Sequence, residues 1–131
     1  MDSVLVTVPV SVKAKLTEKL KERTLNELTK LVEQMDLEIK QISIDRQRDL
    51  DNHPEQSEQI ARFYGNEISQ RQRRREEAII RKETMEKLSI GAEINQGTLE
   101  RQVELKIGDN MRDIVNVEIL IEDDKIIAIR E

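Results

Sequence analysis

Residues 4–12 read "VLVTVPVSV", and valine occupies every second position of this stretch. A period of two in β-branched residues is the pattern of a β-strand with one buried face. Pro9 lies inside the stretch, and proline has no N–H group to donate to a neighbouring strand. We therefore predict an edge strand, or at least a strand that turns the Pro9 nitrogen away from a partner.

Beyond Lys13 the hydrophobic period changes to the alternating three and four of a coiled coil. Asn52 and Pro54 interrupt this period, because the residue before a proline disfavours helix and proline itself suits a first helical turn. Helices over about 14–50 and 55–88, joined by so short a turn, predict an antiparallel hairpin. The expected seam residues are Leu25, Leu28, Val32, Met35, Ile39 and Ile42 on the first helix, and Ile60, Tyr64, Glu67, Arg71, Arg74, Ala78, Arg81, Met85 and Leu88 on the second.

After the second helix the period returns to two, which predicts strands over 99–107, 117–122 and 125–130. The predicted class is α+β: a long antiparallel two-helix coiled-coil hairpin on a small antiparallel β base, formed by the N-terminal strand and the C-terminal strands. We expect a single elongated domain over 1–131. Its β base comprises 1–13 and 89–131, and its helical hairpin stalk comprises 14–88.

The amino-acid composition disfavours several classes of function. Charged residues make up 37% of the chain, as hydrophobic residues do, which suits long helices exposed to water. A net charge of −5 and 2% aromatic residues disfavour a general nucleic-acid coat protein. The sequence has no cysteine for a disulfide or a thiolate metal site. Without a secretory or membrane-spanning pattern, we expect a soluble, cytoplasmic protein that does not enter a membrane.

Residues 91–131, "GAEINQGTLERQVELKIGDNMRDIVNVEILIEDDKIIAIRE", together with the order of elements, resemble the YlqD-like family of small bacterial proteins. Two positions depart from the family: Met111 stands where an aromatic residue is common, and Asp124 where glycine is common. The resemblance implies an α+β protein without an established activity. The matching residues are Gly91, Gly97, Val103, Leu105, Ile107, Gly108, Asp109, Ile119, Ile121, Asp123, Ile127, Ile129 and Arg130.

An arginine-rich run, "QRQRRREEAIIRK" at 70–82, offers the one candidate polyanion-binding site: Arg71, Arg73, Arg74 and Arg75. A hairpin turning near His53 would place Arg71 beside Met35. The favoured interpretation is an ion-paired helix face, with acidic partners at Glu33, Asp36, Glu38, Glu76 and Glu77. The alternative is a patch that binds RNA phosphates.

Apolar residues outside the seam recur along both helices. A two-helix hairpin would leave them in contact with water, so further helices could cover them. We predict a homo-oligomer, with a dimer favoured, and a possible protein partner. The candidate interface residues are Leu31, Leu37, Ile44, Ile68, Ile79 and Ile80.

No residue set points to catalysis. The only histidine, His53, falls at the hairpin tip, where no cleft is expected. We therefore expect no enzyme activity, no cofactor and no metal. The function indicated is a non-catalytic structural or adaptor protein that binds another macromolecule through its coiled-coil stalk. Two alternatives stay open: an RNA- or ribosome-associated factor that uses the arginine face, and a prefoldin-like holdase.

Overall fold

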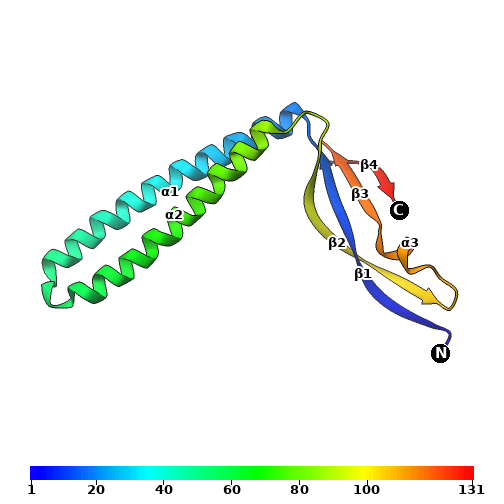
Figure 1. The fold of residues 1–131 in the computed structure, drawn as a ribbon, viewed down its shortest axis with the longest axis horizontal. Coiled ribbons are helices and arrows are strands. Elements are labelled where there is room, and N and C mark those ends of the chain that lie inside the picture. The colour runs from blue at the N-terminus through cyan, green and yellow to red at the C-terminus, as the bar shows by residue number, and fades with distance from the viewer. The chain divides into compact units, whose positions relative to one another are not determined.

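The computed structural model describes residues 1–131, and its helices and strands are drawn in Figure 1. The chain divides into two compact units. The sheet unit comprises Met1–Lys21 and Leu88–Glu131, and the hairpin unit comprises Glu22–Lys87. The elements follow in the order β1 (Ser3–Lys15), α1 (Glu18–Asn52), the 3-10 turn η1 (Pro54–Gln56), α2 (Ser57–Lys87), β2 (Glu93–Lys106), α3 (Met111–Val115), β3 (Glu118–Glu122) and β4 (Lys125–Arg130). The predicted α+β class is confirmed.

The four strands form one sheet in the order β2-β1-β3-β4. β1 pairs with β2 along its whole length and antiparallel, whereas it pairs with β3 in parallel over Ser11–Ala14 only. Of the two alternatives predicted for the first strand, the edge position is therefore wrong, whereas a Pro9 nitrogen turned away from a partner is confirmed. The predicted antiparallel base contains one parallel pair. The connection through α3 explains the parallel pair. It begins after Lys106, which lies beside Ser3, and returns the chain to the level of Ser11.

Pro9 is nevertheless tolerated inside the sheet. The Ser11 N–H donates to the Val117 carbonyl at 3.2 Å, on the side of β1 that faces β3. N–H groups two residues apart point to the same side of a strand, so the Pro9 nitrogen faces that side too. β3 begins to pair only at Ser11, and the missing N–H of Pro9 therefore breaks no bond between strands.

The valine period places the core of the sheet unit. Val8, Val10 and Ala14 point to one face and are buried, and Leu16 is fully buried where β1 ends. Fully burying a side chain of this size stabilises a fold by roughly 1.5–3 kcal/mol. Thr17 then caps α1: its hydroxyl accepts from the Leu20 N–H at 3.1 Å.

The β3–β4 turn lies where the sequence predicted it, whereas β2 begins earlier than predicted. The β3–β4 turn holds Asp123 and Asp124 at φ of 46° and 70°, as a two-residue turn between twisted strands requires. β2 begins at Glu93, six residues earlier than predicted, because Gly97 does not end the strand. Gly97 lies instead at a bulge, opposite the register shift between Val12 and Lys13.

In the hairpin unit α1 and α2 run side by side and antiparallel, joined by η1 (Figure 1). Leu28 and Met35 of α1 and Ala78 of α2 are buried, and all three belong to the predicted seam. Because the Ala78 side chain is small, the two helices can approach closely at this position, and the larger buried side chains come from α1. The seam is narrow, so most other side chains of the hairpin remain at least partly exposed.

Candidate macromolecule-binding surface of the helical hairpin

Ion pairs across the seam define how the two helices are aligned. Arg75 Nε lies 2.6 Å from Asp36 Oδ1, and Arg71 Nε lies 3.9 Å from Glu38 Oε1. Arg71 therefore lies opposite Glu38, not beside Met35 as the sequence predicted. The difference is about one helical turn, and it arises because Pro54–Gln56 form a turn of their own before α2 begins.

The four arginines of the candidate polyanion site divide into two pairs. Arg71 and Arg75 are half-buried at the seam, and Arg71 also pairs with Glu67 on its own helix. Arg73 and Arg74 are exposed and form no ion pair. Arg74 was expected in the seam, but Arg75 takes that place. Only the first pair therefore forms the ion-paired helix face that the sequence favoured.

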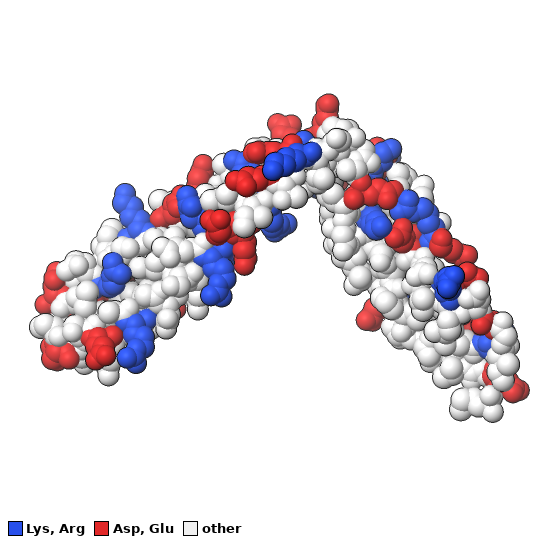
Figure 2. All heavy atoms as spheres, in the orientation of Figure 1, with Lys and Arg blue, Asp and Glu red and all other residues white.

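Asp36 and Glu38 are the two expected acidic partners that the seam uses. Glu33, Glu76 and Glu77 form no ion pair with the arginines. Lys and Arg are interspersed with Asp and Glu over the visible face of the hairpin, so no large patch of one sign appears there (Figure 2). A groove of about 440 Å³ accompanies the seam, lined by Thr29, Val32, Glu33, Ile79, Lys82, Glu83 and Glu86.

The six candidate interface residues divide as well. Leu31, Ile68 and Ile79 flank the seam and are half-buried. Leu37 and Ile44 are 64% and 54% exposed, and a spacing of seven residues sets them two turns apart on one face of α1. Counted at 3.6 residues per turn from buried Met35, that face points away from α2.

Ile80, 52% exposed, points away from α1 by the same count from buried Ala78. The outer faces of two antiparallel helices look in opposite directions. Leu37 and Ile44 on one helix and Ile80 on the other therefore belong to separate surfaces of the hairpin.

The chain's two aromatic residues lie near the hairpin tip. Their rings meet edge to face, with centroids 5.1 Å apart, and Phe63 is 59% exposed. The Tyr64 hydroxyl donates a hydrogen bond to the Asp49 carboxylate, which raises the pKa of Tyr64. Sequence reasoning placed Tyr64 in the seam and missed this bond. The signal was available, since Asp49 follows the seam residue Ile42 at the heptad spacing.

His53, also at the tip, lies with its Nδ1 atom 3.6 Å from Glu55 Oε1. No cluster of three or more His, Cys, Asp or Glu residues in the structure is arranged to hold a metal ion. None of the helices combines the length and the apolar character needed to cross a membrane.

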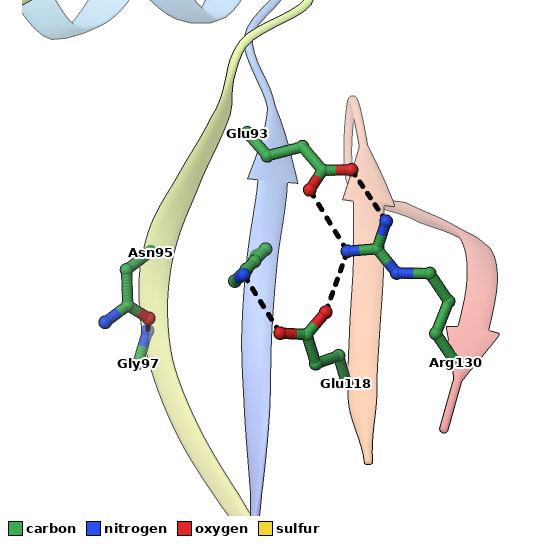
Figure 3. Close-up of polar contacts among 6 residues, drawn as sticks. Glu93, Asn95, Gly97, Glu118 and Arg130 are labelled. Carbon is green, nitrogen blue, oxygen red and sulfur yellow. Dashed lines mark hydrogen bonds and ion pairs between the residues drawn. The ribbon is translucent and has the colours of Figure 1, made fainter. Parts of the chain in front are cut away.

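The sheet unit carries a polar cluster to which all four strands contribute (Figure 3). Arg130 on β4 contacts Glu93 of β2 at 2.9 Å and Glu118 of β3 at 2.9 Å, and Lys13 of β1 contacts Glu118 at 2.9 Å. The bond from Arg130 holds the pKa of Glu93 below its ordinary value, and Lys13 does the same for Glu118. We call these four residues the ion-pair row. Sequence analysis missed it, because the row depends on the strand order.

The fold defines the class of protein: an α+β protein with a four-stranded sheet, in which a long helical hairpin follows β1 and precedes β2 in the sequence. The chain belongs to the YlqD family, whose model, described as YlqD protein, matches residues 4–130. That match confirms the resemblance seen in the sequence.

The crystal structure of a protein of unknown function from Synechococcus sp. WH 8102 has the same fold. Its TM-score is 0.83 at 22% sequence identity, over 98% of this chain and 95% of that one. None of the curated proteins matches the sequence.

Proposed function

We propose that this protein is a non-catalytic binding protein that holds another macromolecule on the outer face of α1. The observation that carries the proposal is the pair Leu37 and Ile44. Both are large apolar residues, more than half exposed, and they lie two helical turns apart on one face. An amphipathic helix bound along another surface commonly presents apolar residues at this spacing. Burial of their remaining apolar surface would contribute at roughly 25 cal/mol per Å².

The charges near these two residues indicate the character of the partner. Two exposed lysines, Lys30 and Lys40, and one exposed acidic residue, Glu33, fall on the same face of α1 by helical geometry. None of the three forms an ion pair, so the face carries an excess of positive charge. A partner helix whose apolar positions are flanked by Asp or Glu would complement this face. Complementary rim charges add to the association rate and to specificity more than to affinity.

The test is capture of binding partners from cell extract by the immobilised protein, followed by direct binding of the partner once it is identified. We expect Leu37→Glu combined with Ile44→Glu to abolish capture. Gln59→Glu combined with Gln70→Glu is the matched control, because it adds the same charge at exposed positions of α2, away from the outer face of α1. If the outer-face variant keeps the partner with unchanged affinity, the proposal is wrong.

A second candidate function, binding of RNA, is favoured by one specific observation: Arg73 and Arg74 are exposed and have no acidic partner. Treatment of the extract with RNase separates the two candidates. Capture that depends on Leu37 and Ile44 and survives RNase supports a protein partner. Capture that disappears with RNase and depends on Arg73 and Arg74 supports RNA.

A further inference from the structure

β4 is an outermost strand of the sheet, and its outer side has no partner in the chain. Such an edge presents a row of unpaired N–H and C=O groups, which is a template for another strand. β4 contains no proline, so each of its residues can both donate and accept. Three of its six residues are isoleucines, and Ile126, Ile127 and Ile129 are 62%, 47% and 69% exposed.

The two edges of the sheet are protected to different degrees. β2, the other outermost strand, has Gly97 at φ of 134° beside a register shift, and it carries the exposed charges Glu100 and Glu104. Twisted backbone and charged side chains are the devices that prevent pairing at an edge. β4 has one register shift near Ile127, and Lys125 is its only charged residue without a partner. The edge open to a further strand is therefore β4.

We propose that two copies of this chain associate through β4, antiparallel and about a two-fold axis, so that their sheets join into one of eight strands. Sheets of this size occur among natural proteins. The two-fold arrangement makes the same six residues serve both copies, which is the commonest form of protein self-association. The exposed isoleucines of one copy then pack beside those of the other.

The charges at the two ends of β4 favour antiparallel over parallel pairing with a second copy. Lys125 begins β4 and Glu131 follows its last residue, and neither has an ion-pair partner in the chain. An antiparallel pair sets the start of one β4 beside the end of the other, so Lys125 meets the partner's Glu131 twice. A parallel pair would set Lys125 beside Lys125. Arg130 is already held by Glu93 and Glu118, which reduces its repulsion of Lys125.

The first test measures molar mass by size exclusion with light scattering at tens of micromolar. We expect a species of twice 15.3 kDa for the unaltered chain. Ile129→Lys should give the single-chain mass, because it places a charge in the joined edge while altering a side chain that is mostly exposed in the monomer. Leu99→Lys is the matched control: Leu99 is 57% exposed on β2, away from β4, and the variant should keep the double mass.

The second test exchanges the two charges. Lys125→Glu alone and Glu131→Lys alone should each weaken self-association by about 2- to 30-fold, as expected for the loss of two exposed ion pairs. The combination of both changes should restore it, because the opposite charges then meet in reversed order. Both residues are exposed, so neither change should affect folding.

Three results would overturn the proposal. The first is a single-chain mass for the unaltered protein. The second is loss of the double mass on Leu99→Lys, or on Leu37→Glu combined with Ile44→Glu, while Ile129→Lys keeps it. The third is a charge exchange that fails to restore association. The proposed binding function of α1 does not depend on any of these results, because the variants that test it, Leu37→Glu and Ile44→Glu, lie on α1.

Discussion

Arg130 and Glu93 form a two-pronged ion pair although their strands stand at opposite edges of the sheet. The two guanidinium nitrogens lie 2.9 and 3.1 Å from the two carboxylate oxygens. β1 and β3 separate the strands, and each contributes a member of the same row, Lys13 and Glu118 (Figure 3). The β3–β4 hairpin joins β1 through only four paired residues. Side chains therefore supply a second attachment where the backbone ladder is short.

Arg130→Lys should lower the urea concentration at which half of the sheet unit is unfolded. Far-UV circular dichroism measures this midpoint. An ammonium group cannot bond two carboxylates with the planar fork of a guanidinium, so the contact with Glu93 loses one of its two bonds. Arg130→Ala should lower the midpoint further. Arg112→Lys, at an exposed position without an ion pair, is the control and should leave it unchanged. An Arg130→Lys midpoint equal to that of the unaltered protein would show that the row adds no stability.

Acid should weaken the sheet unit through Glu93 and Glu118. The bond from Arg130 lowers the pKa of Glu93 from its ordinary 4.5, and the bond from Lys13 lowers that of Glu118. A carboxyl group with a lowered pKa stabilises the fold above its unfolded pKa, and this contribution is lost as the pH falls through the folded pKa. The urea midpoint should therefore fall as the pH drops below 4.5.

The control for this pH dependence is Glu93→Gln combined with Glu118→Gln. It should lower stability at neutral pH and reduce the further loss in acid, because the two groups that take up protons are gone. An equally steep loss in both proteins would assign the acid sensitivity to other carboxylates.

Asp124→Gly should stabilise the protein by about 1 kcal/mol, since glycine adopts positive φ without the steric cost that a side chain brings. Asp124 holds a φ of 70° in the β3–β4 turn. Asp123→Gly should gain less, although its φ is also positive, because the Asp123 carboxylate accepts a 2.8 Å hydrogen bond from Thr17. Thermal unfolding of the two variants checks this order, and a larger gain for Asp123→Gly would contradict it.

Truncation of a leucine side chain to alanine should cost more stability in the seam of the hairpin than on its outer face. Leu28 is 5% exposed, and Leu28→Ala should cost about 2–3 kcal/mol through lost burial and the cavity left behind. Leu37→Ala makes the same chemical change at a residue that is 64% exposed, and should cost less than about 0.5 kcal/mol. Urea unfolding measures both. Equal costs would mean that Leu37 is covered, for instance by a second copy.

The arginine run should bind RNA weakly or not at all. A net charge of −5 opposes phosphate binding, and Arg71 and Arg75 are held by carboxylates. We expect negligible RNA binding at about 150 mM salt, and Arg73→Glu combined with Arg74→Glu should change stability by no more than about 0.5 kcal/mol. Arg75→Glu should destabilise the hairpin, because it sets a second carboxylate beside Asp36. Micromolar RNA binding that the Arg73 and Arg74 variant loses would reverse this expectation.

The sequence by itself determined the kind and order of the elements. Alternating valines from Val4 to Val12, heptad spacing from Leu25 to Ile42 and the Asp123–Asp124 turn are local signals, and each acts within one element. Seam residues Leu28, Met35 and Ala78 followed from the same periods. The sequence also indicated the family, because the residues that match it are concentrated in the C-terminal strands.

Only the tertiary structure decided which elements are neighbours. The parallel pairing of β1 with β3 depends on where the connection through α3 returns the chain, and no local pattern encodes that return. The seam register shifted by a turn because η1 takes up residues at the hairpin tip. Arg130 could be matched with Glu93 only after the strand order was known, because the two residues are 37 positions apart in the sequence. Contacts between distant segments depend on the packing of the whole unit, whereas periodicity reports only which face of each element avoids water.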